Sequence, residues 1–185
     1  MIRILSLICL FAVSVTSSAE VGLKFGRYTS DKPAAMVKQF RPMLSTLGRR
    51  LEELLGEPVK IRIDVAKDYT SGLQRLVNGD VDFARFGPAS YVAVRVLDPS
   101  VDVLAMESRY GGRTFYGVIC VKEDSPVQQI SDLRGKRFSF GSERSTIGRH
   151  LTQKLLIDNK IISSGLKQFA YLGRHDKVAA AVVVG

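Results

Sequence analysis

Beyond an apolar N-terminal segment, the chain alternates between short runs with the two-residue period of strands and longer runs with a helical period. In residues 58–64, Val59, Ile61 and Ile63 alternate with charged side chains, which indicates a half-buried strand. In residues 33–55, apolar side chains recur at helical spacing: Met36, Phe40, Met43, Leu44, Leu47, Leu51, Leu54 and Leu55. Because short connections separate successive runs, this order favours a layered α/β fold over an all-β or α+β fold.

The same two periods predict the bounds of the remaining elements. We expect strands at 21–26, 58–64, 81–85, 101–107, 114–121, 137–140 and 168–172. We expect helices at 33–55, 70–78, 89–97, 130–134, 146–159 and 175–184. Pro42 is expected to kink or restart the first helix, and Gly56 to end it. Two consecutive glycines within 110–113 indicate the best domain boundary, either as a hinge or as a simple hairpin turn.

Residues 1–19 have the pattern of a signal peptide. Arg3 supplies a positive charge, residues 4–15 are almost entirely apolar, and the small residues 17–19 offer a cleavage site before Glu20. The apolar run is too short to span a bilayer comfortably. We therefore predict an exported, periplasmic protein whose mature chain has no stable insertion into the membrane.

Charge and cysteine content narrow the classes of partner. The formal net charge is +9, but the basic residues are scattered and are not interleaved with aromatic residues. This pattern predicts no nucleic-acid partner and is compatible with an anionic ligand. Cys9 would leave with the signal peptide, and Cys120, within an apolar run, is expected to be a buried strand thiol. With two histidines in the chain, we predict neither a metal site nor a cofactor.

The segment 143–148 is the strongest candidate for a binding site. Ser145 and Thr146 lie between a predicted strand and a predicted helix. The first N–H groups of a helix have no partner within the helix, and the helix dipole adds partial positive charge, so a small oxyanion is favoured there. The alternative is that Ser145 or Thr146 only caps its own helix, as most such residues do.

Three more turns follow strands and open helices. They bring Tyr69, the segment 86–91 with Phe86, Ser90 and Tyr91, and His175 to the carboxyl edge of the predicted sheet. Ligands of open α/β sheets bind beyond that edge. We predict no catalytic residue, because the chain has no Gly-x-Ser-x-Gly elbow and no Walker A motif, and Ser145 has no evident base.

Taken in order, these segments resemble the phosphonate-type periplasmic substrate-binding proteins of ABC transporters. The matching stretches are Asp68-Tyr69, residues 81–84, residues 86–91, Asp124-Ser125-Pro126, residues 132–136, Phe140-Gly141, Ser145-Thr146 with Gly148, and Arg174-His175-Asp176. The resemblance implies the two-lobed type II periplasmic-binding-protein fold, with lobe 1 at 20–109 and lobe 2 at 113–185. Members of the family continue beyond the position of Gly185, so the second half is expected to be incomplete.

The resemblance also implies a function and a set of binding residues. Tyr69, Ser145 and Thr146 would hold the phosphonate oxygens, and His175 would complete this shell. Phe86 falls where some members have tyrosine, so Tyr91, with Ser90, is a further candidate. The implied function is capture of a phosphonate, phosphite or phosphate ion for an ABC transporter permease. The alternative is the extracytoplasmic ligand-sensing domain of a signalling protein, with the same fold and site.

Overall fold

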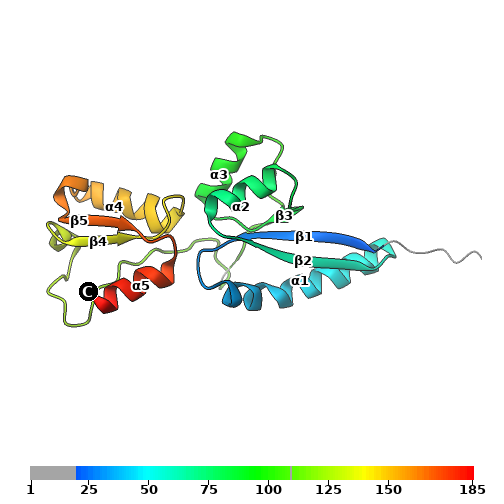
Figure 1. The fold of residues 1–185 in the computed structure, drawn as a ribbon, viewed down its shortest axis with the longest axis horizontal. Helices are drawn as coiled ribbons and strands as arrows, with labels where there is room; N and C mark the ends of the chain where they lie inside the picture. The colour runs from blue at the N-terminus through cyan, green and yellow to red at the C-terminus, as the bar shows by residue number, and fades with distance from the viewer. Residues whose placement is uncertain (1–19, 109) are drawn as a thin grey trace, which may run out of the picture.

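A computed structural model describes residues 20–108 and 110–185 of the chain (Figure 1). The predicted signal peptide, residues 1–19, lies outside the described residues. The described chain forms two parallel sheets, one from each half of the sequence. Figure 1 shows the two halves side by side along the long axis, and the described residues between them, 98–108 and 110–129, form no helix or strand. Among the described residues, no helix has both the length and the apolar composition needed to cross a membrane.

The first sheet has the strand order β2-β1-β3. Strand β1 (Val21–Tyr28) pairs in parallel with β2 (Val59–Ala66) along its whole length and with the short strand β3 (Phe83–Ala84). Helix α1 (Pro33–Leu55) covers one face of the sheet (Figure 1). Helices α2 (Tyr69–Val77) and α3 (Pro88–Leu97) lie on the other face. The predicted alternation of strand and helix is therefore confirmed over residues 21–97.

The core of the first half lies between α1 and the sheet. Phe25, Phe40 and Leu44 are buried together, and the ring centroids of Phe25 and Phe40 are 5.4 Å apart. The helix runs through Pro42 without a second start, contrary to one of the two alternatives expected. Pro42 lies on the exposed side, where water can bond to the carbonyl that loses its partner. Gly56, with φ of 71°, ends the helix as predicted.

The second sheet pairs β4 (Arg137–Phe140) in parallel with β5 (Gln168–Tyr171). The predicted helix 146–159 is divided into a π-helical turn, η2 (Thr146–Leu151), and helix α4 (Thr152–Asp158). Helix α5 (His175–Val184) has the predicted bounds and lies across the sheet from α4 (Figure 1). Two 3-10 turns, η1 (Ile130–Leu133) and η3 (Ser163–Gly165), complete this half. Its buried core residues are Leu133, Phe140, Leu156, Ile161 and Leu166.

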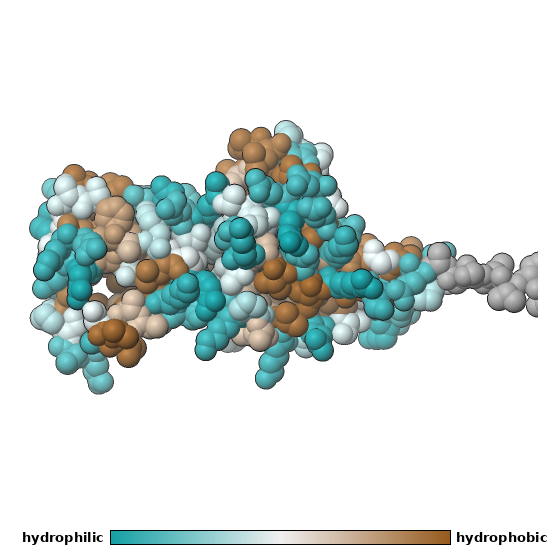
Figure 2. All heavy atoms as spheres, viewed as in Figure 1, coloured by the Kyte–Doolittle hydropathy of each residue, from teal (hydrophilic) through white to brown (hydrophobic). Residues whose placement is uncertain are grey.

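Two predicted strands, 101–107 and 114–121, are wrong. Both segments are irregular and mostly exposed, with Leu104 at 85% and Val118 at 79% of full exposure. A strand requires a paired backbone, and the described residues supply no neighbouring strand for either segment. Cys120, expected to be buried, is exposed for the same reason. Figure 2 shows apolar side chains gathered in patches on the surface of both halves.

The start of α2 depends on a side-chain cap. The Asp68 carboxylate accepts hydrogen bonds from the N–H and the hydroxyl of Ser71, at 2.8 and 2.7 Å. We expect Asp68→Ala to lower the free energy of unfolding by about 1 kcal/mol and Asp68→Asn to change it much less, since Asn is also a good cap. Urea unfolding of both variants measures this difference.

The cap also predicts a pH dependence. The hydrogen bonds from Ser71 lower the pKa of the Asp68 carboxyl below its ordinary value. Because the folded pKa lies below the unfolded one, the stabilisation is present above about pH 4 and is lost as the pH falls further. The difference in stability between wild type and Asp68→Ala should shrink below that pH. A difference that stays constant down to pH 2 would contradict this account.

Candidate functional site

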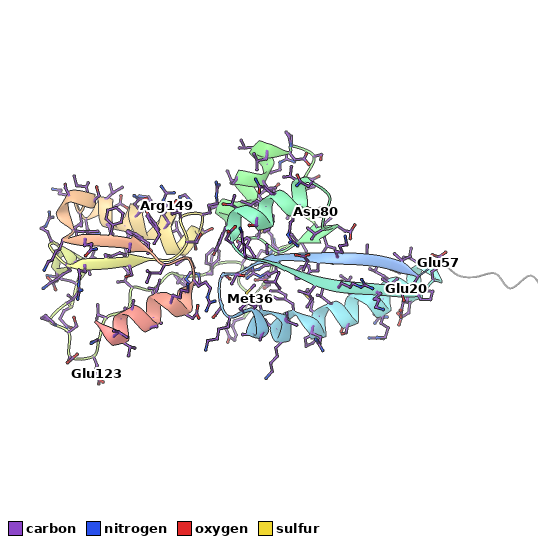
Figure 3. All side chains as sticks on the ribbon, viewed as in Figure 1. Glu20, Met36, Glu57, Asp80, Glu123 and Arg149 are labelled. Carbon is purple, nitrogen blue, oxygen red and sulfur yellow. The ribbon has the colours of Figure 1, made fainter. Side chains whose placement is uncertain are left out.

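The candidate site lies where the carboxyl ends of the two sheets face each other. Two hydrogen bonds join the turns of the two halves directly. The backbone N–H of Ala89 donates to Thr146 Oγ1 at 3.0 Å, and Arg144 Nε donates to Thr70 Oγ1 at 2.9 Å. Figure 3 shows side chains from both halves converging on the region between α2 and η2. The fold therefore brings turns far apart in sequence to one place.

Ser145 and Tyr69 form the buried centre of this region. Ser145 is 4% exposed and caps η2, with its Oγ accepting the N–H of Gly148 at 2.9 Å. Tyr69, at the start of α2 in the other half, is 6% exposed, and its hydroxyl interacts with the side chain of Ser145. Burial raises the pKa of the Tyr69 phenol, so the hydroxyl stays protonated and can donate at neutral pH. The structure thus brings together two of the predicted residues.

The π-helical turn places these donors against the end of β4. The carbonyl of Ser145 accepts from the N–H groups of both Arg149 and His150, at 3.2 Å each, which widens the first turn. The Arg149 guanidinium, labelled in Figure 3, donates to the carbonyl of Glu143 at 3.0 Å and closes the turn from outside. Such π-helical turns are frequent at functional sites. Sequence reasoning predicted a helix here but not its widened start.

Two glycines allow the turn to touch the strand. The Gly141 N–H donates to the carbonyl of Gly148 at 2.9 Å. A Cβ added at Gly148 would lie 3.0 Å from Gly141 Cα and 3.0 Å from Ser145 Oγ. Both distances are tighter than nearly all contacts that a real Cβ makes, so the neighbouring atoms would have to shift by a few tenths of an ångström. The position of Ser145 therefore depends on the absence of a side chain at Gly148.

Tyr28 supports the site and was missed by sequence reasoning. It is 2% exposed, and its ring stacks on Tyr69, with ring centroids 3.8 Å apart. Its hydroxyl hydrogen-bonds to Ser90 Oγ at 3.2 Å and accepts the N–H of Gly87 at 3.1 Å. Phe86 also stacks on Tyr28, with ring centroids 5.5 Å apart. Ser90 and Phe86, predicted as ligand contacts, thus pack around Tyr28, which itself ends β1 at the edge where the other candidates were found.

His175 and Tyr91 are placed less centrally. His175 is exposed at the start of α5, its backbone N–H donates to the carbonyl of Ser30 at 3.1 Å, and its ring lies beside Gly141. This backbone bond also joins the two halves. Tyr91 is half-buried in α3, and no side-chain hydrogen bond or ring contact of the described residues joins it to the other candidates. The structure brings His175 to the edge of the site but not Tyr91.

A groove elsewhere on the molecule does not contain the candidate residues. A groove of about 530 Å³ between α1 and β2 is lined by residues of those two elements and contains none of the candidates. Within residues 20–108 and 110–185, no group of His, Cys, Asp and Glu side chains is arranged to hold a metal ion.

Comparison with known proteins gives consistent matches. The profile of a family described as "ABC transporter, phosphonate, periplasmic substrate-binding protein" matches residues 25–185. The chain is 27% identical over 164 residues to the phosphate-import protein PhnD of Mycolicibacterium smegmatis, covering 83% of this chain and 50% of that protein. It is 26% identical over 187 residues to a probable ABC transporter phosphite binding protein, PhnD1, of Prochlorococcus marinus, covering 97% of this chain and 60% of that protein.

A solved structure supports the fold. The chain superposes on PhnD1 of Prochlorococcus marinus in complex with methylphosphonate with a TM-score of 0.58 and 21% identity. The match covers 87% of this chain and 59% of that structure. The chain therefore spans about half to three fifths of the length of the proteins it matches. These relatives are named as transport proteins, and none of them supports the sensing alternative.

Proposed function

The chain belongs to the family of periplasmic substrate-binding proteins of phosphonate ABC transporters, and from this premise we propose that it captures a small phosphorus oxyanion and presents it to an ABC transporter permease. The proposal places binding between the two halves, at Tyr69, Ser145 and Thr146. It includes no chemical step. The protein would act by holding the ion and, with the halves closed on it, by removing it from water.

The meeting of Tyr69 and Ser145, which interact where the two halves adjoin, carries this proposal. These two buried residues come from opposite halves, so an ion held by both ties the halves together. The hydroxyl of Thr146 lies beside them, where it accepts the Ala89 N–H and can still donate its own proton. Neutral hydroxyl donors at the start of a helix are well suited to a tetrahedral oxyanion.

The identity of the oxyanion is proposed only as a class. The named relatives are a phosphate-import protein, a probable phosphite binding protein, and a protein in complex with methylphosphonate. These ions share a tetrahedral phosphorus with oxygens that accept hydrogen bonds. We therefore propose that the chain takes an ion of this class. His175, at the edge of the site, and Phe86, Ser90 and Tyr91 would shape the region around its remaining substituent.

The absence of catalysis is also part of the proposal. The family consists of transport proteins, and the Ser145 side chain accepts the N–H of Gly148 and interacts with Tyr69. Neither partner is a general base that would make Ser145 a nucleophile. A periplasmic location after removal of residues 1–19, and division into lobes at 20–109 and 113–185, remain predictions from the sequence.

Calorimetric titration of the purified protein tests the proposed function. Phosphate, phosphite and methylphosphonate are the ligands, and sodium chloride at matched ionic strength is the control. We expect saturable binding of at least one phosphorus oxyanion with one ion per chain. A protein with a cooperative unfolding transition that binds none of the three would overturn the proposal.

A further inference from the structure

Arg27, in β1, is a buried cation that forms no ion pair with a carboxylate in the part of the chain that the structure describes. Its side chain is 7% exposed. One terminal nitrogen donates to the carbonyl of Arg85 at 3.2 Å and the other to Ser30 Oγ at 3.4 Å. The buried Nε has no hydrogen-bond partner among the described residues. A buried charge is normally paired with an opposite charge, so this arrangement requires an explanation.

The neighbouring charges do not neutralise Arg27. Arg85 lies beside it, and both carboxylate oxygens of Glu107 accept hydrogen bonds from Arg85, at 2.9 and 2.7 Å. The Glu107 carboxylate is thus engaged by Arg85, and among the described residues no hydrogen bond or ion pair joins Arg27 to a carboxylate. Burial lowers the pKa of the Arg27 guanidinium, and the charge of Arg85 lowers it further. Since arginine nevertheless stays protonated in proteins, this cluster of Arg27, Arg85 and Glu107 carries one excess positive charge.

This cluster adjoins the candidate site on the side of Tyr28. Arg27 Cζ is 5.3 Å from the centroid of the Tyr28 ring, which stacks on Tyr69, and Tyr69 in turn interacts with Ser145. The loop after β1 reaches the second half as well, because the Ser30 carbonyl accepts the N–H of His175. A charge at this depth acts through protein rather than water, so its field reaches the bound ion with little screening.

We infer that Arg27 makes the site select a doubly charged tetrahedral oxyanion over a singly charged one of the same shape. This inference rests on the proposed function. The donors Tyr69, Ser145 and Thr146 are neutral and recognise the positions of the oxygens. Those groups respond weakly to the total charge of the ion. The excess positive charge of the cluster responds to it directly, and a second negative charge on the ligand compensates it.

Packing alone does not account for a charged group at this position. Arg27 also lies over the ring of Phe40, with Cζ 5.4 Å from the ring centroid. A methionine would fill much of the same space next to Phe40 without leaving an unpartnered nitrogen. The variants Arg27→Met and Arg27→Lys therefore separate packing from charge, because the first removes the charge and the second keeps it.

The test compares methylphosphonate and methanesulfonate at pH 8.5. The two ions have the same tetrahedral shape, but the first carries two negative charges at this pH and the second carries one. Calorimetry gives the dissociation constant of each for wild type, Arg27→Lys and Arg27→Met, with Arg49→Met on the exposed face of α1 as the control. The ratio of the two constants is the quantity of interest.

We expect wild type and Arg49→Met to prefer methylphosphonate by at least about tenfold. Arg27→Lys should keep most of this preference and Arg27→Met should lose most of it, through weaker binding of methylphosphonate. Glu107→Gln, which leaves Arg27 in place, should increase the preference because it removes the compensating carboxylate. These changes concern the ratio, which a general loss of packing would not move.

Unchanged ratios in Arg27→Met and Glu107→Gln would overturn the inference while wild-type binding upheld the proposed function. If Arg27→Met also weakened the binding of both ions by the same factor, the role of Arg27 would be packing. A folded wild-type protein that bound none of methylphosphonate, methanesulfonate and phosphate would reject the proposed function itself. Should Arg27→Met fail to fold, Glu107→Gln decides.

Discussion

A chain in which Ser145 is replaced by Ala and Thr146 by Val is expected to bind phosphorus oxyanions about a hundredfold more weakly, or worse. Both hydroxyls lie at the start of η2, and Ser145 is buried against Tyr69. Each ligand oxygen left without a donor in a buried site loses about 1–3 kcal/mol, and the double variant removes two donors. Calorimetric titration with methylphosphonate, phosphite and phosphate measures the loss.

The control for this double variant is Ser164→Ala combined with Thr46→Val. Both control residues are exposed and lie away from the site, on η3 and α1. The control should bind like wild type. Because Thr146 also accepts the Ala89 N–H, urea unfolding of the double variant must accompany the titration. Unchanged affinity in a folded double variant would show that the ion binds elsewhere.

Local signals were sufficient for much of the fold. The bounds of α5 and β4 match the expectation from periodicity and from the residues that flank them. The turn with Ser145 could be identified locally, because the free N–H groups at the start of a helix favour an anion whatever the rest of the fold. The family resemblance added the order of the turns, and the parallel pairing of β4 with β5 brings two of them to one edge.

Features that depend on distant partners were not predictable in the same way. Residues 101–107 and 114–121 have the composition of strands, but pairing decides whether a strand forms. Tyr28 could have been found, since it is the last residue of β1, at the edge where the other candidates follow their strands. Arg27 could not, because its burial beside Arg85, which is itself paired with Glu107, arises only when β1 packs against the segment after β3. In sequence it is one of 27 basic residues.

Gly148 provides none of the proposed side-chain donors, but the position of Ser145 depends on it. We expect Gly148→Ala to lower the free energy of unfolding by about 1–3 kcal/mol, the usual range for overpacking a tight contact. This result would run against helix propensity, which favours Ala over Gly by about 1 kcal/mol. The added Cβ meets Gly141 Cα and Ser145 Oγ at 3.0 Å, and the first of these is backbone that cannot rotate away.

The same substitution should weaken oxyanion binding at least tenfold while leaving every proposed donor in the sequence. The contact can be relieved only if η2 moves away from β4 or if Ser145 turns from Tyr69, and either movement separates donors that must converge on one ion. The matched control is Gly165→Ala in the same half, where the nearest atom, Ile161 Cγ2, is at an ordinary 3.7 Å. Urea unfolding and calorimetry on both variants separate the effects. If Gly148→Ala binds methylphosphonate like wild type, the close approach of η2 to β4 is not what positions Ser145, and the site tolerates a wider start to the helix than the structure implies.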